Sequence, residues 1–268
     1  MAPIRVLVCG ACGKMGRTVL QAVSAQTDMA LAGAVDVAHV GEDAGVVAGL
    51  GPLNVLIQDD LEAAAESGAP DVMVDFTQPV AVMANLRRAL ARKINCVVGT
   101  TGLSADDLAE VRRLCEAHGA TAIVAPNFSL GATVMMQCAQ LAAKHFDYAE
   151  ILELHHEQKK DAPSGTALRT ADLMAEARST PFARAPTEQV KLDGARGGEH
   201  RGVVVHSIRL PGLVAHQSVM FGGTGETLTI RHDTTGRDSF IPGVLLATRE
   251  VMQRKELVRG LASLVGLE

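Results

Sequence analysis

A short apolar run at residues 4–9, IRVLVC, restricts the fold of this chain most strongly. A nearly continuous run of this length is typical of a strand that is buried on both faces. A turn with three spaced glycines follows it, and a helical pattern then continues to Ala25. A doubly buried strand that leads into a helix indicates a parallel sheet with helices packed on it.

The alternation of strand and helix continues through the first part of the chain. Further strands are predicted at residues 30–36, 71–76, 95–101 and 120–126. A helix with regular apolar spacing is predicted after Pro79, and another begins at the capping residue Ser104 and stops at Gly119. Up to about residue 125 the sequence therefore predicts a parallel sheet covered by helices.

The pattern changes after this region. A long apolar helix is predicted at 130–145, and the polar, glycine-rich segment 181–201 is expected to be a mobile loop or hinge. Three strands follow at 202–210, 215–221 and 226–233, and then a helix at 239–253. Because the links PGLV and GGTG are short, neighbouring strands among these three are expected to be antiparallel.

Composition excludes several classes of function. The net charge is −5 and the pI is near 6.0, so we expect no surface for nucleic acid or acidic lipid. There is no Trp and only one Tyr, which disfavours stacking platforms for single-stranded nucleic acid. The apolar run at the N-terminus is too short for a signal peptide, and none reaches the roughly twenty residues of a membrane helix. We therefore predict neither a nucleic-acid partner nor a membrane association.

The five cysteines are odd in number and scattered. This usage is typical of free thiols in a reducing compartment, so we expect a cytoplasmic protein. Cys9 and Cys12 form a C-x-x-C motif, but no matching pair accompanies it, and packing explains it better than a redox or zinc site. No metal site is predicted.

The turn after the first strand reads GACGKMG, with glycines at Gly10, Gly13 and Gly16. Its G-x-x-G-x-x-G spacing permits a tight turn whose backbone N–H groups face a pyrophosphate at the start of the helix. Asp36 lies twenty residues after Gly16, at the end of the second strand, where a carboxylate can bind ribose hydroxyls. The alternative is a plain strand–helix turn, but the acid favours a dinucleotide site.

Two further motifs follow predicted strands, GTTG at 99–102 and APNFS at 125–129. Ligands of open α/β sheets bind at the carboxyl ends of the strands. Small and hydroxylated residues there let backbone groups approach a nicotinamide, although each motif alone is equally well a plain turn.

The densest stretch is ELHHEQKKDAPSGTA, residues 153–167. His155 and His156 end a strand-like segment, and Lys159 follows in a loop. Ser164 can cap a helix whose first N–H groups, at Gly165 and Thr166, favour an anion. The alternative is a solvated charge run. We favour a site that protonates a carboxylate substrate, because histidine titrates near neutral pH and lysine can donate a proton or pair with an anion.

These motifs together resemble the 4-hydroxy-tetrahydrodipicolinate reductase (dihydrodipicolinate reductase) family over the whole chain. The resemblance implies an α/β protein with a Rossmann-like parallel sheet domain at 1–126 and 237–268. A central mixed α/β domain with a largely antiparallel sheet, at 127–236, would bind the substrate and assemble a homotetramer. The implied reaction is the NADH- or NADPH-dependent reduction of a small-molecule dicarboxylate, 4-hydroxy-tetrahydrodipicolinate, to tetrahydrodipicolinate in lysine and diaminopimelate biosynthesis.

The resemblance also implies the roles of individual residues. His155 is the expected proton donor and acceptor and Lys159 the expected proton donor, and which of them delivers the proton stays open. Substrate would be bound by His156, Gly165 and Thr166. The cofactor would be lined by Gly10, Ala11, Cys12, Gly13, Lys14, Met15, Asp36, Gly99, Thr100, Thr101, Ala125, Pro126, Asn127 and Phe128. His232 and Arg237 are equally well substrate contacts or structural residues.

One departure from the family bears on the cofactor. Many members carry Arg directly after the acid of the second strand, where it meets the 2′-phosphate of NADPH, whereas this chain has Val37. An acid without this Arg favours NADH, although Lys14 or Arg17 could compensate. Three rival functions remain: another NAD(P)-dependent dehydrogenase of a small carboxylate, a non-catalytic dinucleotide sensor, and a structural oligomer.

Overall fold

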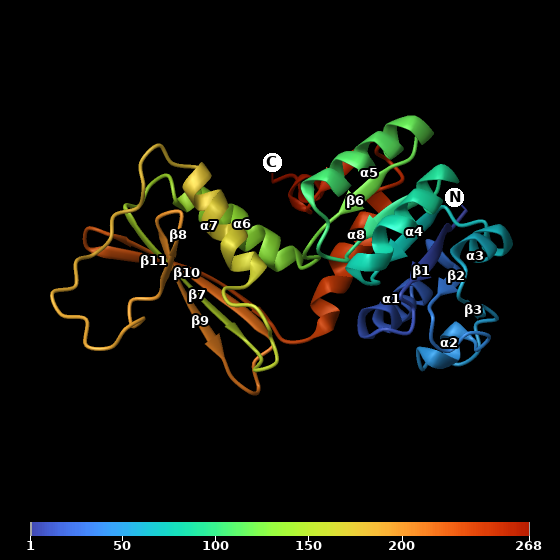
Figure 1. Ribbon diagram of the computed structural model, residues 1–268, viewed down its shortest axis with the longest axis horizontal. Helices are drawn as coiled ribbons and strands as arrows, with labels where there is room; N and C mark the ends of the chain where they lie inside the picture. The colour runs from blue at the N-terminus through green and yellow to red at the C-terminus, as the bar shows by residue number, and fades with distance from the viewer. Residues whose placement is uncertain (1, 268) are drawn as a thin grey trace. The chain divides into compact units, whose positions relative to one another are not determined.

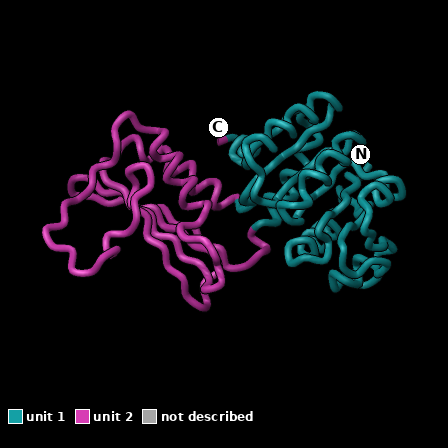
Figure 2. The backbone as a smooth tube through the Cα atoms, viewed as in Figure 1, with its two compact units in different colours: residues 1–129, 240–266, 268 teal, residues 130–239, 267 magenta. Residues whose placement is uncertain are grey.

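The computed structural model describes residues 2–267, and they divide into two compact units (Figure 2). Unit 1 comprises residues 2–129 and Phe240–Gly266, and unit 2 comprises Leu130–Ser239 with Leu267. Among the described residues no helix is both long enough and apolar enough to cross a membrane.

Unit 1 is built on a seven-stranded parallel sheet with the strand order β12-β6-β5-β4-β1-β2-β3 (Figure 1). Its strands are β1 (Ile4–Cys9), β2 (Met29–Val35), β3 (Ile57–Gln58), β4 (Val72–Asp75), β5 (Asn95–Val98), β6 (Ala122–Val124) and β12 (Leu257–Arg259). Its helices are α1 (Lys14–Ser24), α2 (Ala44–Val47), α3 (Leu61–Gly68), α4 (Pro79–Ala91), α5 (Ala105–His118) and α8 (Ile241–Glu250), with the 3₁₀ turn η2 (Ala262–Val265). A second 3₁₀ turn, η1 (Arg237–Phe240), spans the boundary in the chain between unit 2 and unit 1. The predicted parallel α/β fold is confirmed.

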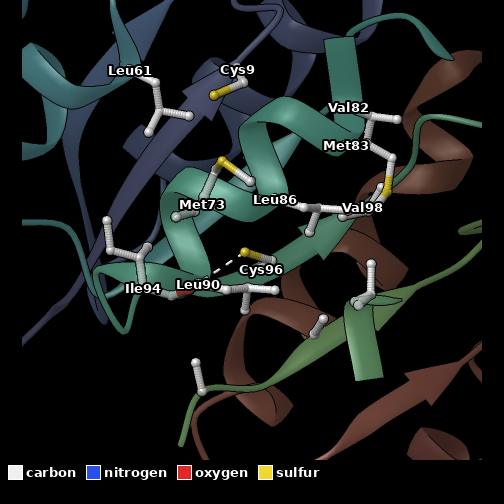
Figure 3. Packing of buried hydrophobic residues seen from close by; sticks show 14 of the residues in the cluster. Cys9, Leu61, Met73, Val82, Met83, Leu86, Leu90, Ile94, Cys96 and Val98 are labelled. Carbon is white, nitrogen blue, oxygen red and sulfur yellow. Dashed lines mark hydrogen bonds between the residues drawn. The ribbon is translucent and has the colours of Figure 1, made fainter. Parts of the chain in front are cut away.

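Both faces of this sheet are covered by helices. Leu7 and Cys9 of β1 belong to a core that also contains side chains of α3, α4 and α5. Figure 3 shows Leu86 and Leu90 of α4 in this core, beside Met73 and Cys96 of neighbouring strands. The alternate residues of β1, such as Val8, are equally buried, because α1 contacts the same strand and packs against α8.

The sequence signals for the helix ends are also confirmed in α5. Ser104 accepts a hydrogen bond from the Asp107 N–H (3.1 Å), and the Asp107 carboxylate accepts one from the Ser104 N–H (2.8 Å). This reciprocal pair is a capping box. Gly119 ends the helix with a positive φ of 66°, a conformation that glycine adopts without strain.

Unit 2 contains a five-stranded mixed sheet with the order β11-β10-β7-β9-β8. Its strands are β7 (Tyr148–His155), β8 (Gly198–His200), β9 (Val203–Arg209), β10 (Ala215–Gly223) and β11 (Glu226–Thr234). Helices α6 (Leu130–Ala142) and α7 (Gly165–Glu176) share one hydrophobic core with the sheet, as residues such as Ala139, Met174 and Phe221 show. The predicted largely antiparallel sheet is confirmed, since only β7 and β9 pair in parallel.

One predicted pairing in unit 2 is wrong. Strands β10 and β11 form the expected antiparallel hairpin, but β9 and β10 are not neighbours, because β7 lies between them and pairs with both. The link 210–214 therefore spans the carboxyl end of β7, where the Leu210 N–H donates to the carbonyl of His155 (3.1 Å). The short link crosses the end of β7 and does not form a hairpin turn.

Candidate functional site

The glycine loop of unit 1 accepts no side chains at two positions. A Cβ on Gly10, whose φ is +76°, would lie 2.5 Å from the carbonyl oxygen of Phe76. A Cβ on Gly16 would lie 2.0 Å from the carbonyl oxygen of Gly10. Gly13 is the N-cap of α1, so the first-turn N–H groups of this helix have no capping side chain. The loop thus has the close backbone turn and the helix N-terminus that a pyrophosphate requires.

The carboxylate of Asp36 is held beside this loop. Its Oδ2 accepts a hydrogen bond from the Cys12 N–H (2.9 Å) and its Oδ1 accepts one from the Ala38 N–H (3.0 Å). Arg17 also contacts the loop, since its Nε donates to the carbonyl of Cys12 (2.9 Å). Val37 is 91% exposed, so an apolar side chain occupies the position that follows the acid.

The other predicted cofactor residues follow neighbouring strands of the same sheet. Gly99, Thr100 and Thr101 come after β5, and Ala125, Pro126, Asn127 and Phe128 come after β6. The Ala125 N–H donates to the carbonyl of Val98 (3.0 Å), which joins the two strand ends. In a parallel sheet the carboxyl ends of these strands and of β1 all lie on the same side of the sheet. This is the side on which α/β proteins bind ligands.

A buried carboxylate that lies close to these strand ends, in the motif DFT at residues 75–77, was assigned no role from the sequence. Asp75, at the end of β4, is 0% exposed and accepts hydrogen bonds from the Thr77 N–H (3.0 Å) and hydroxyl (2.7 Å). It also accepts from the Thr100 hydroxyl (2.7 Å) and from Nδ2 of Asn85 (2.8 Å). The Thr100 hydroxyl therefore donates its hydrogen bond to Asp75. The available signal was the acid Asp75, which follows the apolar residues VMV of the predicted strand.

Aromatic packing explains another residue of the predicted cofactor set. A Cβ on Gly99 would lie 2.1 Å from the ring of Phe76. The Phe76 ring in turn packs on Phe128, with ring centroids 5.7 Å apart. Gly99 is thus required by the Phe76 ring, and this packing role is independent of its predicted contact with a cofactor.

The thiols near the glycine loop are poor nucleophiles. All five cysteines are free, and Cys9 is completely buried. Burial, together with the negative charge of Asp36, raises the pKa of Cys12 to about 11. A thiol with this pKa is protonated at neutral pH.

In unit 2 the end of β7 holds a histidine against a buried acid. Nδ1 of His155 lies 2.5 Å from Oε2 of Glu153, because residues two apart on a strand share a face. Glu153 is 0% exposed, and both of its oxygens are also bound by the guanidinium of Arg209, at 2.9 and 2.8 Å. Burial raises the pKa of Glu153, but hydrogen bonds from His155, Arg209 and Ser207 outweigh it and lower the pKa to about 2. The group is therefore a permanent anion at neutral pH.

Lys159 lies in the loop that follows. Its N–H donates to the carbonyl of His156 (3.2 Å), and its ammonium donates to Oδ1 of Asp161 (2.7 Å). This contact lowers the pKa of Asp161. The Lys159 side chain is 22% exposed, whereas His156 is exposed.

Helix α7 begins where sequence analysis placed its start. Ser164 is its N-cap and accepts a hydrogen bond from the Ala167 N–H (3.2 Å). Gly165 is exposed, and a Cβ added to it would have open space around it. It is the first residue of the helix and is followed by Thr166. An exposed helix N-terminus therefore follows His155 and Lys159 within a few residues of the chain. Such an N-terminus favours a carboxylate.

The two residues left open by the sequence have different surroundings. The ring of His232 lies against the start of α6, where a Cβ on Gly131 would be 2.7 Å away. Burial lowers the pKa of His232. Arg237 is exposed in η1.

Comparisons with known proteins cover the whole chain. Residues 4–128 match the family model for the N-terminus of dihydrodipicolinate reductase, and residues 131–265 match the model for its C-terminus. The chain is 52% identical over 265 residues to the 4-hydroxy-tetrahydrodipicolinate reductase of Moorella thermoacetica, covering 99% of each. It is 48% identical to that of Gloeobacter violaceus, covering 98% of the chain and 99% of the relative.

Solved structures agree with this assignment. The dipicolinate-bound dihydrodipicolinate reductase of Paenisporosarcina sp. TG-14 superposes with a TM-score of 0.87 at 40% identity, over 97% of this chain and 99% of that one. An amine dehydrogenase from Mycobacterium smegmatis, at 16% identity with a TM-score of 0.68, shares the fold alone. The chain belongs to the dihydrodipicolinate reductase family.

Proposed function

We propose that this chain catalyses the NAD(P)H-dependent reduction of 4-hydroxy-tetrahydrodipicolinate to tetrahydrodipicolinate in lysine and diaminopimelate biosynthesis. The observation that carries the proposal is the segment 155–166 of unit 2. It combines a histidine bound to a buried anion, a lysine and a helix N-terminus. The names of the relatives and the dipicolinate bound to the Paenisporosarcina enzyme support a dicarboxylate as the substrate.

The residues of unit 1 fit a dinucleotide. Gly10 and Gly16 leave the space that a Cβ would fill, and the helix start and Asp36 match a pyrophosphate and a ribose. A reduced nicotinamide cofactor supplies the hydride when it is bound. The predicted cofactor residues, from the glycine loop to Phe128, would hold it.

The residues of unit 2 supply binding and a proton. The start of α7 at Gly165 and Thr166, with His156, would bind the substrate carboxylates, and the ammonium of Lys159 would pair with one of them or protonate the substrate. The 4-hydroxyl group of the substrate leaves as water, hydride addition to the resulting conjugated imine leaves negative charge on the substrate, and a positioned acid quenches this charge. We propose His155 and Lys159 for this task.

The function is tested by mixing the purified protein with NADH and freshly made product of dihydrodipicolinate synthase. Loss of NADH absorbance that depends on this product is the expected result. A dinucleotide sensor would bind NADH without oxidising it, and a structural oligomer would not bind NADH. A dehydrogenase of another carboxylate would oxidise NADH only with that other substrate.

We propose that NADH is preferred over NADPH, because Val37 places no cation beside Asp36. Val37→Arg is expected to lower the KM for NADPH about tenfold, since a hydrogen bond to a charged group contributes about 1.5–3 kcal/mol. Val46→Arg, at another exposed valine of unit 1, is the matched control and should leave this KM unchanged. An unchanged KM for NADPH in Val37→Arg would show that the preference does not depend on this position.

We also propose that the chain forms a homotetramer through the uncovered face of the unit 2 sheet. Residues that alternate with the core positions Ala149 and Phe221 point away from α6 and α7, and they include Tyr148 and Met220, which are 45% and 40% exposed. Sedimentation at micromolar concentration should give four times the chain mass of 28.1 kDa. A monomer mass would contradict this assembly.

A further inference from the structure

A connected group of side chains in unit 2 extends beyond the residues assigned so far. Its centre is Glu153, which is completely buried and holds His155 on one side and Arg209 on the other. Arg209 stands at the end of β9, directly opposite His155 in the strand register. Its two terminal nitrogens bind the two oxygens of Glu153 separately, which is the bidentate geometry that fixes both groups in orientation.

The same pair reaches the other two parts of the proposed site. Nη2 of Arg209 also donates to the carbonyl of Asp161 (2.8 Å), the residue whose carboxylate binds Lys159. Oε1 of Glu153 accepts from the Ser164 N–H (3.2 Å), which lies directly before the start of α7. The histidine, the lysine loop and the helix N-terminus are therefore all connected by hydrogen bonds to the ion pair of Glu153 and Arg209.

We infer that Glu153 and Arg209 are positioning residues for the reduction: Glu153 fixes the proton of His155 on Nδ1, and Arg209 fixes the loop that carries Lys159. This inference rests on the proposed function. A carboxylate that accepts from one ring nitrogen sets the tautomer and directs the other nitrogen, Nε2, to the reacting partner. Glu153 itself moves no proton, because its ionised form is strongly stabilised where it lies.

A purely structural role explains the pair less well. The backbone ladder already joins β7 and β9 from Glu150↔Val204 to His155↔Arg209, so the side chains are not needed to pair the strands. A buried ion pair usually adds little net stability, because the desolvation of both charges offsets their attraction. What this ion pair specifically provides is a fixed orientation of His155 and of the lysine loop.

The test uses two variants of the full chain. Glu153→Gln removes the buried anion and leaves the partly exposed guanidinium of Arg209 without its carboxylate partner, so this variant can fold poorly. The double variant Glu153→Gln with Arg209→Met removes both charges at similar volume and separates misfolding from misplacement. Asp172→Asn is the matched control, because Asp172 also pairs with one histidine, His200 (2.8 Å), and one arginine, Arg201 (3.5 Å), but on the surface of the same unit.

The expected result is a loss of kcat of about 10²-fold in both Glu153 variants, as for a catalytic group that is misplaced by about 1 Å. The KM for the dicarboxylate should change less than kcat, and the Kd for NADH should stay unchanged, because the cofactor residues lie in unit 1. Nitrogen NMR of histidine-labelled protein should show that His155 loses its single Nδ1–H tautomer. Asp172→Asn should keep kcat within about twofold, since surface ion pairs contribute little.

Two results would overturn the inference: a folded double variant with the kcat of the wild type, or an unchanged His155 tautomer in the Glu153 variants. Failure of the proposed function is a separate result. In that case the wild-type chain would not oxidise NADH with the dicarboxylate, while the NMR measurement would still judge the role of Glu153.

Discussion

Lys159→Ala should lower kcat with the dicarboxylate by roughly two to four powers of ten, which is the contribution of a positioned proton donor. The ammonium of Lys159 is held 2.7 Å from Asp161 in a loop between the end of β7 and the start of α7. In the proposed mechanism, its removal takes away both a cation for a substrate carboxylate and a source of the proton. The measurement is steady-state NADH oxidation at saturating cofactor.

Lys160→Ala is the control for this prediction. Lys160 is the next residue and is exposed, so its removal changes the net charge equally without touching the contact with Asp161. Its kcat should stay near that of the wild type. A Lys159→Ala variant with activity within a factor of about two of the wild type would remove Lys159 from the catalytic assignment, because even modest acid catalysis contributes more than this.

Gly16→Ala should raise the Kd for NADH by about 10²-fold or more, as expected when a close backbone approach to the pyrophosphate is lost. The new Cβ would lie 2.0 Å from the carbonyl oxygen of Gly10 and 2.8 Å from the Cα of Ala11, both of which are backbone atoms. Neither can move aside as a flexible side chain would, so the turn between β1 and α1 must open. Fluorescence titration of NADH measures the effect.

The control is Gly198→Ala, at a glycine with open space around it and no positive φ. It should bind NADH as the wild type does. Thermal unfolding of both variants separates an opened loop from a lost fold. A folded Gly16→Ala protein that binds NADH with an unchanged Kd would show that the glycine loop is not the cofactor site.

Much of the fold and the site could be predicted because the signals are local. IRVLVC and its glycine turn lie in one continuous stretch, and they predicted β1, α1 and their tight connection. His155, Lys159 and Ser164 lie within ten residues, so their order alone indicated a strand end, a loop and a capped helix.

The missed features depend on contacts between distant residues. Arg209 is 56 residues from Glu153, and nothing in the local pattern distinguishes it from an exposed end of a strand. Glu153 itself carried a signal, since it lies two residues before His155 and so shares its face, but its burial follows only from its partners. Likewise, the place of β7 between β9 and β10 could not be read from the short link of 210–214, which has the length of a hairpin turn.

We expect the chain to transfer a hydride from its nicotinamide cofactor to the dicarboxylate. NADH deuterated on the transferred position, incubated with the protein and freshly made product of dihydrodipicolinate synthase, tests it directly by mass spectrometry of the product. We predict one deuterium atom in each molecule of tetrahydrodipicolinate. Oxidation of the labelled NADH with no deuterium in the product, or no oxidation at all, would contradict the account.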